Sequence, residues 1–440
     1  MDRLRRRRLP AALLLLLTTL PGCDSAVEPA PREAQPLPAS SPAALPTAAL
    51  ALGYVPGEDP TERAIAAAQQ AVREQPDAID RYANLATWLL RRARETSDGS
   101  YRLYAEDALR AARARDERNP QVLLLSAMVL QDQHRFRGAA ALAREYIALR
   151  PDDSTGSLVL GDALLELGEY DPAIDAYQQA MNLRPDLRSY NRAAHMRWLL
   201  GDADDAREIL VMAIDAGSER DPESRAWCFV DLGEIDLRTG DLDRAEQSAR
   251  AALSLVPAYW PAQVLLARVL HRRGHADEAI AQLDAALAHK STAEDLLRLS
   301  DWLEQAGRSD DAKARRTEAE ALVEAEPRAW AHWLARHGRE PARAVELAQR
   351  ELAARRNLVA LDTAALTLLR AGRLDEAAAA LAQARKLGTR DAELELHAGL
   401  LAHARGDVAA ARASLASALA LDPGVDPLLA GELAHAVGEA

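Results

Sequence analysis

The chain has 440 residues, of which 49% are hydrophobic and only 4% aromatic, and alanine and leucine supply most of the apolar side chains. Small, helix-favouring residues in this proportion argue against a sheet-rich enzyme, and so many apolar residues beside 28% charged ones argue against disorder throughout. The formal net charge of -13 gives no general attraction to phosphate backbones, so we expect no nucleic-acid partner.

Residues 1–22 have the order of a secretory signal peptide. Five arginines end at Arg8, an apolar run extends from Leu9 to Leu20, and Leu20-Pro21-Gly22-Cys23 follows. The run is shorter than the roughly 20 apolar residues that span a bilayer as a helix. The last four residues resemble the lipobox of bacterial lipoproteins, which implies cleavage before Cys23 and lipidation of its thiol. An ordinary signal peptide and an uncleaved anchor remain alternatives.

Lipidation at Cys23 implies a protein that is anchored in a membrane of the bacterial cell envelope and faces the periplasm, in either the inner or the outer membrane. Eight of the 22 prolines follow between Asp24 and Pro60. Because proline-rich chain cannot sustain a helix and favours extended conformations, we expect residues 23–59 to be a disordered tether.

The next element is a helix over residues 60–78. Asp59 is suited to cap it, Pro60 to occupy its first position and Glu62 to complete a capping box. Asp426 and Pro427 repeat this pattern and predict a capping helix within residues 426–440. Both helices are amphipathic, so we expect them to cover the two ends of a stack of repeats.

Between these helices the sequence repeats itself. In residues 154–187 a Leu-Gly pair at Leu160 and Gly161 precedes a turn glycine at Gly168, then Ala173 and Tyr177, with a closing proline. This arrangement resembles the tetratricopeptide repeat, a 34-residue pair of helices, A and B. The small residue of helix A recurs at Ala86, Ala127, Gly161, Ala194, Gly233, Ala267, Ser300, Ala331, Ala365 and Gly399.

The same register assigns turn glycines at Gly201, Gly240, Gly274, Gly307, Gly338, Gly372 and Gly406. Glycine suits these positions because it ends a helix in the left-handed conformation at little cost. The resemblance implies an all-α fold, a right-handed superhelical solenoid of about ten helix-turn-helix repeats over residues 79–425 with flanking capping helices.

The residues that usually carry chemistry form no recognisable site. His271 and His275 are four apart, but they lack the glutamate of a zinc-protease motif and Gly274 lies between them, so we expect solvated side chains. The other histidines are scattered over different repeats. Cys228 has no histidine near it, and no glycine-rich phosphate loop is present. We therefore expect no enzyme, no cofactor and no metal.

A helical solenoid offers a concave surface for partners, and in this family helix A lines it. The positions that the resemblance assigns to that surface are Asn191, His195, Trp198, Trp227, Glu234, Arg238, Arg268, His271 and Arg272, with Asp162 and Glu166 from the preceding repeat. Tryptophan beside arginine and carboxylate is typical of binding hot spots. The alternative for each residue is an ordinary place on the surface or between repeats.

The combined features predict a lipid-anchored, non-enzymatic scaffold or adaptor that binds a protein or peptide in its concave groove. A carrier or regulatory subunit for a non-protein ligand, such as an exported polysaccharide, is the alternative. The shortage of aromatic residues weighs against the alternative, because sugar sites use exposed aromatic side chains. Glycan binding that is lost on Trp198→Ala would support it.

Overall fold

The structure, a computed structural model, describes residues 46–96 and 98–438. The predicted signal peptide, Cys23 and the first part of the predicted tether lie outside this range. Within it every regular element is helical and no strand occurs. None of these helices combines the length and apolar character needed to cross a membrane.

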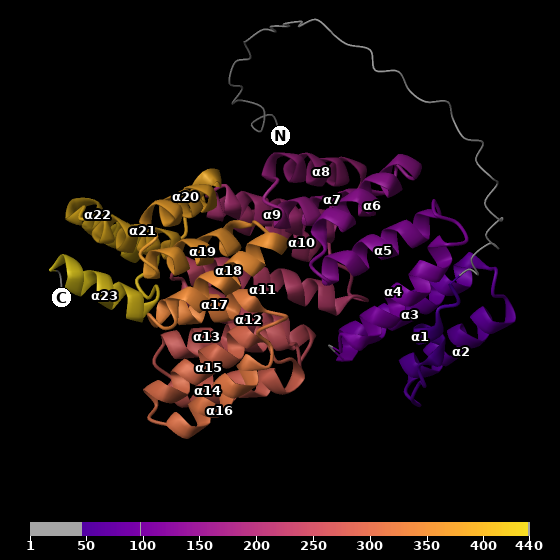
Figure 1. Ribbon diagram of the computed structural model, residues 1–440, viewed down its shortest axis with the longest axis horizontal. Coiled ribbons are helices and arrows are strands. Elements are labelled where there is room, and N and C mark those ends of the chain that lie inside the picture. The colour runs from indigo at the N-terminus through magenta and orange to yellow at the C-terminus, as the bar shows by residue number, and fades with distance from the viewer. Residues whose placement is uncertain (1–45, 97, 439–440) are drawn as a thin grey trace, which may run out of the picture. The chain divides into compact units, whose positions relative to one another are not determined.

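The first half of the fold contains helices α1 to α12 (Figure 1). Their bounds are α1 Ala49–Gly53, α2 Pro60–Glu74, α3 Ile79–Thr96, α4 Ser100–Arg113, α5 Pro120–Asp132, α6 Phe136–Leu149, α7 Ser154–Glu166, α8 Tyr170–Leu183, α9 Leu187–Leu199, α10 Ala203–Asp215, α11 Pro222–Arg238 and α12 Leu242–Leu255.

The second half contains helices α13 to α23 and a 3-10 turn, Arg385–Leu387, after α20. Their bounds are α13 Trp260–Arg272, α14 Ala276–His289, α15 Ala293–Gln305, α16 Ser309–Glu320, α17 Pro327–Arg336, α18 Pro341–Ala354, α19 Leu358–Arg370, α20 Leu374–Ala384, α21 Ala392–Ala404, α22 Val408–Leu421 and α23 Pro427–Val437.

Helices α3 to α22 form ten antiparallel pairs, each an A helix followed by a B helix that packs against it. Helices α1 and α2 precede the pairs and α23 follows them. Most A helices also contact the A helix of the next repeat, as α15 does α17 and α19 does α21. The predicted all-α solenoid of about ten repeats is therefore confirmed.

The turns between A and B helices depend on the glycines that the register identified. Gly168 and Gly201 have φ angles of 73° and 86°, a conformation that residues with a Cβ seldom adopt. In each turn the amide that follows the glycine donates back to a carbonyl of the helix, as Asp202 does to the Arg197 carbonyl at 2.9 Å. The other predicted turn glycines also have positive φ, so this part of the register is confirmed.

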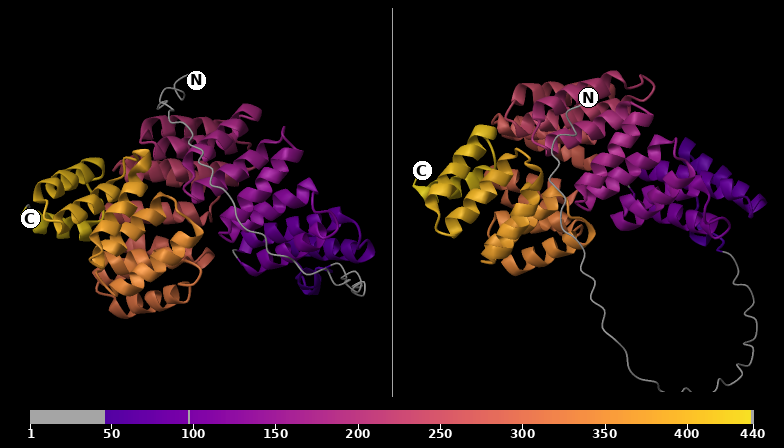
Figure 2. Two further views of the ribbon diagram at one scale, coloured as in Figure 1. Left: turned by 45° about the horizontal axis from the view of Figure 1, so that its top comes forward. Right: turned by 90° about the horizontal axis from the view of Figure 1, so that it is seen from above.

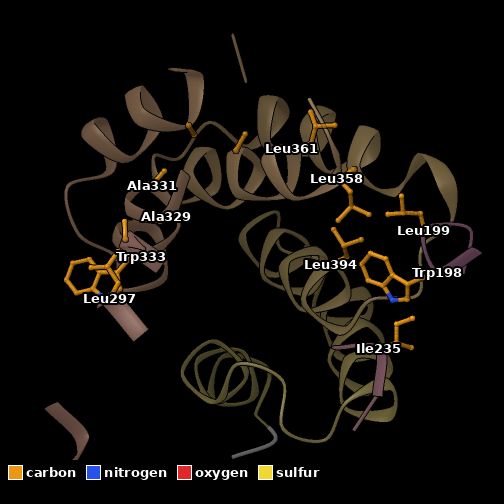
Figure 3. Close-up of a cluster of buried hydrophobic side chains, with 14 of the residues drawn as sticks. Trp198, Leu199, Ile235, Leu297, Ala329, Ala331, Trp333, Leu358, Leu361 and Leu394 are labelled. Atoms are coloured by element: carbon orange, nitrogen blue, oxygen red, sulfur yellow. The ribbon is translucent and has the colours of Figure 1, made fainter. Parts of the chain in front are cut away.

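Small residues let paired helices approach. A Cβ on Gly161 would collide with the Tyr177 ring on α8, and one on Gly233 would collide with Leu265 on α13. The main core cluster extends from α7 to α21. Figure 3 shows Trp198 and Leu199 of α9 beside Leu358 and Leu394, so the core joins repeats that are far apart in the sequence.

The predicted tether is wrong for its last part, because residues 46–59 are ordered against the first repeats. The Asp107 carboxylate of α4 accepts hydrogen bonds from the amides of Leu50 and Ala51 at 2.8 and 3.2 Å, and Ala51 is fully buried. Gln69 of α2 donates to the Ala51 and Tyr54 carbonyls. Proline content does not reveal such contacts, which come from side chains elsewhere in the chain.

Both flanking helices begin as predicted. Asp59 accepts hydrogen bonds from the amides of Thr61 and Glu62, and Asp426 caps α23 in the same way. The capping box at Glu62 does not form. Its carboxylate accepts instead from the hydroxyls of Tyr54 and Tyr101.

Candidate functional site

The predicted groove residues on α9 differ in accessibility. Asn191 is buried and donates to the Asp231 carboxylate at 2.6 Å, and Trp198 is 9% exposed. His195 is accessible to solvent, with its ring 5.9 Å from that of Trp198. Desolvation within the concave face lowers the pKa of His195 to about 4, so the imidazole is neutral at physiological pH.

Asp162 and Trp227 belong to a network between repeats. Arg192 of α9 forms an ion pair with Asp162 of α7 at 2.9 Å, and its guanidinium lies 4.9 Å from the centre of the Trp227 ring on α11. The Tyr177 hydroxyl donates to the same carboxylate at 2.8 Å. These contacts engage both carboxylate oxygens of Asp162 and tie three successive repeats together.

Arg238 and Arg272 contact the C-terminal repeats of the same chain. Arg238 pairs at 3.0 Å with Asp391, the residue that caps α21, and its guanidinium lies over the Trp198 ring. Arg272 forms two hydrogen bonds with Asp422, which follows α22. The sequence register did not foresee these partners, because 153 and 150 residues separate the members of the two pairs.

Glu166 takes part in a similar contact. Its carboxylate accepts a hydrogen bond from Asn357, the cap of α19, at 2.9 Å, and its carbonyl accepts from the Arg356 amide at 2.7 Å. Thr389, before α21, donates to the Leu199 carbonyl. A Cβ on Gly168 would lie 2.5 Å from the Arg356 carbonyl oxygen, and one on Gly201 would lie 2.7 Å from that of Gly388.

We call this set of contacts the closure. In it the turns after α7, α9 and α11 meet the loops before α19, α21 and α23, in the same order. Figures 1 and 2 show the orange helices α19 and α20 beside the magenta helix α9. Successive turns meet successive loops, so the closure aligns repeats that are five to six units apart.

Inside the closure lies a cavity of about 760 Å³. The A helices α11, α13, α15, α17, α19 and α21 and the loop before α23 supply its walls. Of the predicted residues Arg238, Arg268, His271 and Arg272 line it, and the His271 ring stacks on Trp302 with the ring centres 4.3 Å apart. His271 is therefore not the freely solvated side chain that we expected.

The cavity residues on α15 to α21 escaped the sequence prediction. The second residues of α15, α17, α19, α21 and α23 all line the cavity: Glu294, Arg328, Val359, Glu393 and Leu428. We call them the inner ladder. Their equivalent places in successive helices are visible in the register, and extending the groove assignment beyond Arg272 would have found them.

In the part of the chain that the structure describes, six arginines and seven carboxylates line the cavity, and each of these arginines has a carboxylate partner. Arg328 and Arg298 both pair with Glu294, and Arg336 lies between Asp301 and Asp426. The remaining arginine pairs are Arg238–Asp391, Arg268–Glu234 and Arg272–Asp422. The Arg328 charge keeps the pKa of Glu294 well below its ordinary value.

Two histidines lie at the cavity, one of them buried and the other a partly exposed residue of its lining. His397 of α21 is 2% exposed, and its ring contacts the Asp362 carboxylate at 2.9 Å. Burial alone would lower the pKa of His397, but Asp362 outweighs burial and raises it to about 9. The His332 ring, 6.3 Å away, has its pKa lowered to about 4 by burial and by the His397 charge.

Among the described residues no group of three or more His, Cys, Asp or Glu side chains is placed to hold a metal ion. Cys228 is buried against Asn191, and desolvation raises the pKa of its thiol to about 12, which disfavours the reactive thiolate. The arrangement of the cavity suits recognition of a partner by charge and apolar contact, and nothing in it points to catalysis.

Comparison with known sequences identifies the repeat. A tetratricopeptide repeat family model matches residues 124–188, 158–224 and 363–426, and a second one matches residues 236–303. Anaphase-promoting complex subunit 7 of Arabidopsis thaliana is 26% identical over 178 residues, which are 40% of this chain and 31% of that protein. The chain thus spans about a third of the length of that curated relative.

Several solved structures are similar at low identity. The human IFIT1 dimer with m7Gppp-AAAA has a TM-score of 0.47 and 15% identity, over 74% of this chain and 76% of that one. Pseudomonas aeruginosa PilF has a TM-score of 0.38 and 17% identity, over 48% of this chain and 94% of that one. Cut9–Hcn1 of the APC/C has a TM-score of 0.34 and 15% identity, over 86% of this chain and 96% of that one. With its repeat register, its ten helix pairs and the matched segments, this chain belongs to the tetratricopeptide repeat family.

Proposed function

We propose that the protein is a lipid-anchored adaptor of the bacterial cell envelope that holds a segment of a partner protein in its central cavity. The repeats make it a protein-interaction scaffold of a generally non-catalytic family. The observation that carries the proposal is the cavity itself, because the A helices of successive repeats present their inner faces to one space, which is open to solvent. Its volume of about 760 Å³ lies within the usual range for ligand pockets.

The walls of the cavity have the composition of a binding site. Arginines and carboxylates supply its polar surface, and Trp302 and Trp333 of the lining are each only 7% exposed, so the accessible apolar surface comes from aliphatic side chains. Two large aliphatic side chains, Val359 and Leu428, are 39% and 44% exposed there. Such exposure leaves apolar surface that a partner can bury.

A polysaccharide carrier has less support. The tryptophan that we named for it, Trp198, is 9% exposed and lies beneath Arg238. A sugar ring needs an accessible aromatic face, which Trp198 does not offer.

The proposal is tested by filling the cavity. Val359→Trp places a larger side chain in it, and Val408→Trp is the matched control, because Val408 is equally exposed but lies on α22 away from the cavity lining. We expect the full-length protein and the control to capture the same partner from solubilised envelope membranes, and Val359→Trp to lose it. Capture that survives Val359→Trp in a folded protein would refute binding in the cavity.

The lipid anchor is tested separately. Cys23→Ala removes the thiol that the lipobox implies, so we expect loss of metabolic labelling by radioactive palmitate and release of the protein from membranes. Cys228→Ala, a change at a buried thiol, is the control and should leave labelling intact. Unchanged labelling of Cys23→Ala would show that the anchor is assigned wrongly.

A further inference from the structure

We propose that the partner segment in the cavity carries a lysine or arginine side chain, flanked by apolar residues, whose charge pairs with Glu393. This inference rests on the proposed function and gives the chemistry of the partner. It comes from three consecutive members of the inner ladder, Val359, Glu393 and Leu428, which present an apolar, an acidic and an apolar side chain to the cavity.

The first step concerns the arginines. Each of the six in the cavity walls already has a carboxylate partner within the chain. An anionic ligand would have to displace one of those carboxylates, which would leave a partly buried acid without its partner at a considerable cost. The arrangement therefore disfavours an anion although the cavity is rich in arginine.

The second step concerns Glu393. Within residues 46–96 and 98–438, its carboxylate is the one in the cavity lining that has no hydrogen bond or ion pair, and it is accessible to solvent. Desolvation by the surrounding walls and repulsion from Asp391 raise its pKa. A cation beside it would relieve both effects, because an opposite charge favours the ionised form.

The third step concerns the neighbours of Glu393 on the ladder. Val359 and Leu428 are large aliphatic side chains exposed within the cavity, on the repeat before that of Glu393 and on the flanking helix α23 after it. Burying each contributes about 25 cal/mol per Å² of apolar surface removed from water. Ladder positions Glu294 and Arg328 already pair with one another and offer no free charge.

The spacing of the ladder sets the spacing in the partner. The A helices of successive repeats pack together, and packed helices lie about 8–10 Å apart. An extended chain advances about 3.3 Å per residue, so three residues cover that distance. We therefore expect an extended segment with the basic residue in the centre and apolar residues about three positions before and after it.

The experiment is selection of random dodecapeptides displayed on phage, with the immobilised full-length protein as bait and the Val359→Trp variant for counter-selection. We expect the recovered peptides to be enriched in lysine or arginine with apolar residues about three positions to either side. Glu393→Lys should weaken their binding about tenfold or more, and Glu393→Gln should weaken it by less, because the amide keeps the shape and loses the charge.

Asp310→Lys is the matched control. Like Glu393, Asp310 is an exposed acidic residue at the second position of its helix, here the B helix α16, but it lies away from the cavity. It should bind the peptides as the unmodified protein does. Cavity-dependent peptides without a basic residue, or with binding unaffected by Glu393→Lys, would overturn the inference and leave the proposed function standing. If the selection recovers no peptide whose binding Val359→Trp abolishes, both the inference and the proposed function are overturned. Circular dichroism of each variant checks that it is folded.

Discussion

The closure makes a quantitative prediction for two glycines that differ in one respect. Gly201 and Gly274 end A helices with φ angles of 86° and 82°. A Cβ on Gly201 would lie 2.7 Å from the Gly388 carbonyl oxygen, whereas one on Gly274 would have no atom within 4 Å. Alanine at either position costs about 1–2 kcal/mol for its left-handed backbone. At Gly201 the collision adds about 1–3 kcal/mol of overpacking.

The two variants are compared by urea unfolding, followed by circular dichroism and tryptophan fluorescence. We expect Gly201→Ala to lose about 1–3 kcal/mol more unfolding free energy than Gly274→Ala. Hydrogen exchange locates the difference. Amides at the start of α21, next to Gly388, should exchange faster in Gly201→Ala and remain unchanged in Gly274→Ala. Equal losses from both variants, with unchanged exchange near Gly388, would refute the assignment of this contact.

Two further predictions concern charge. Arg272→Ala removes the ion-pair partner of Asp422, whose side chain is 8% exposed, so we expect a loss of about 2–3 kcal/mol in unfolding free energy. Arg273→Ala is the control, because it breaks ion pairs near the surface and should cost less than about 1 kcal/mol. Similar losses would contradict the role of Arg272 in the closure. The folded-state pKa of His397, about 9, lies above its ordinary value of 6.5, so its ion pair with Asp362 stabilises the protein fully below pH 6.5 and loses its effect as the pH rises to about 9. This stabilisation amounts to about 3 kcal/mol, and the urea midpoint should fall accordingly as the pH rises. We expect His397→Gln to abolish that fall. A pH dependence unchanged in His397→Gln would show that another group causes it.

Local features of the fold were predictable because their causes lie within one repeat. Turn glycines, helix caps such as Asp59 and small residues such as Gly161 act on neighbours within the same pair of helices or the same turn, and the sequence repeats them. The closure was not predictable in this way. Whether Arg238 meets Asp391 depends on small rotations added over several repeats, and no single repeat contains that information.

The candidate site was found in part for the same reason. The repeat register placed Arg268 and His271 on the inner face, where they line the cavity. It did not show that Arg272 forms an ion pair with Asp422, since that partner is 150 residues away. The buried pair of His397 and Asp362 was missed because its members lie on different repeats and neither stands in a recognisable motif.

The closure also limits how this array can change in length. In an ordinary solenoid each repeat touches its neighbours alone, and the stability is close to a sum of neighbouring terms, so units are gained or lost with little effect elsewhere. Here an extra repeat between α12 and α18 would move the turns after α7, α9 and α11 out of step with all three of their loops together. The number of repeats between the matched turns and loops is therefore fixed.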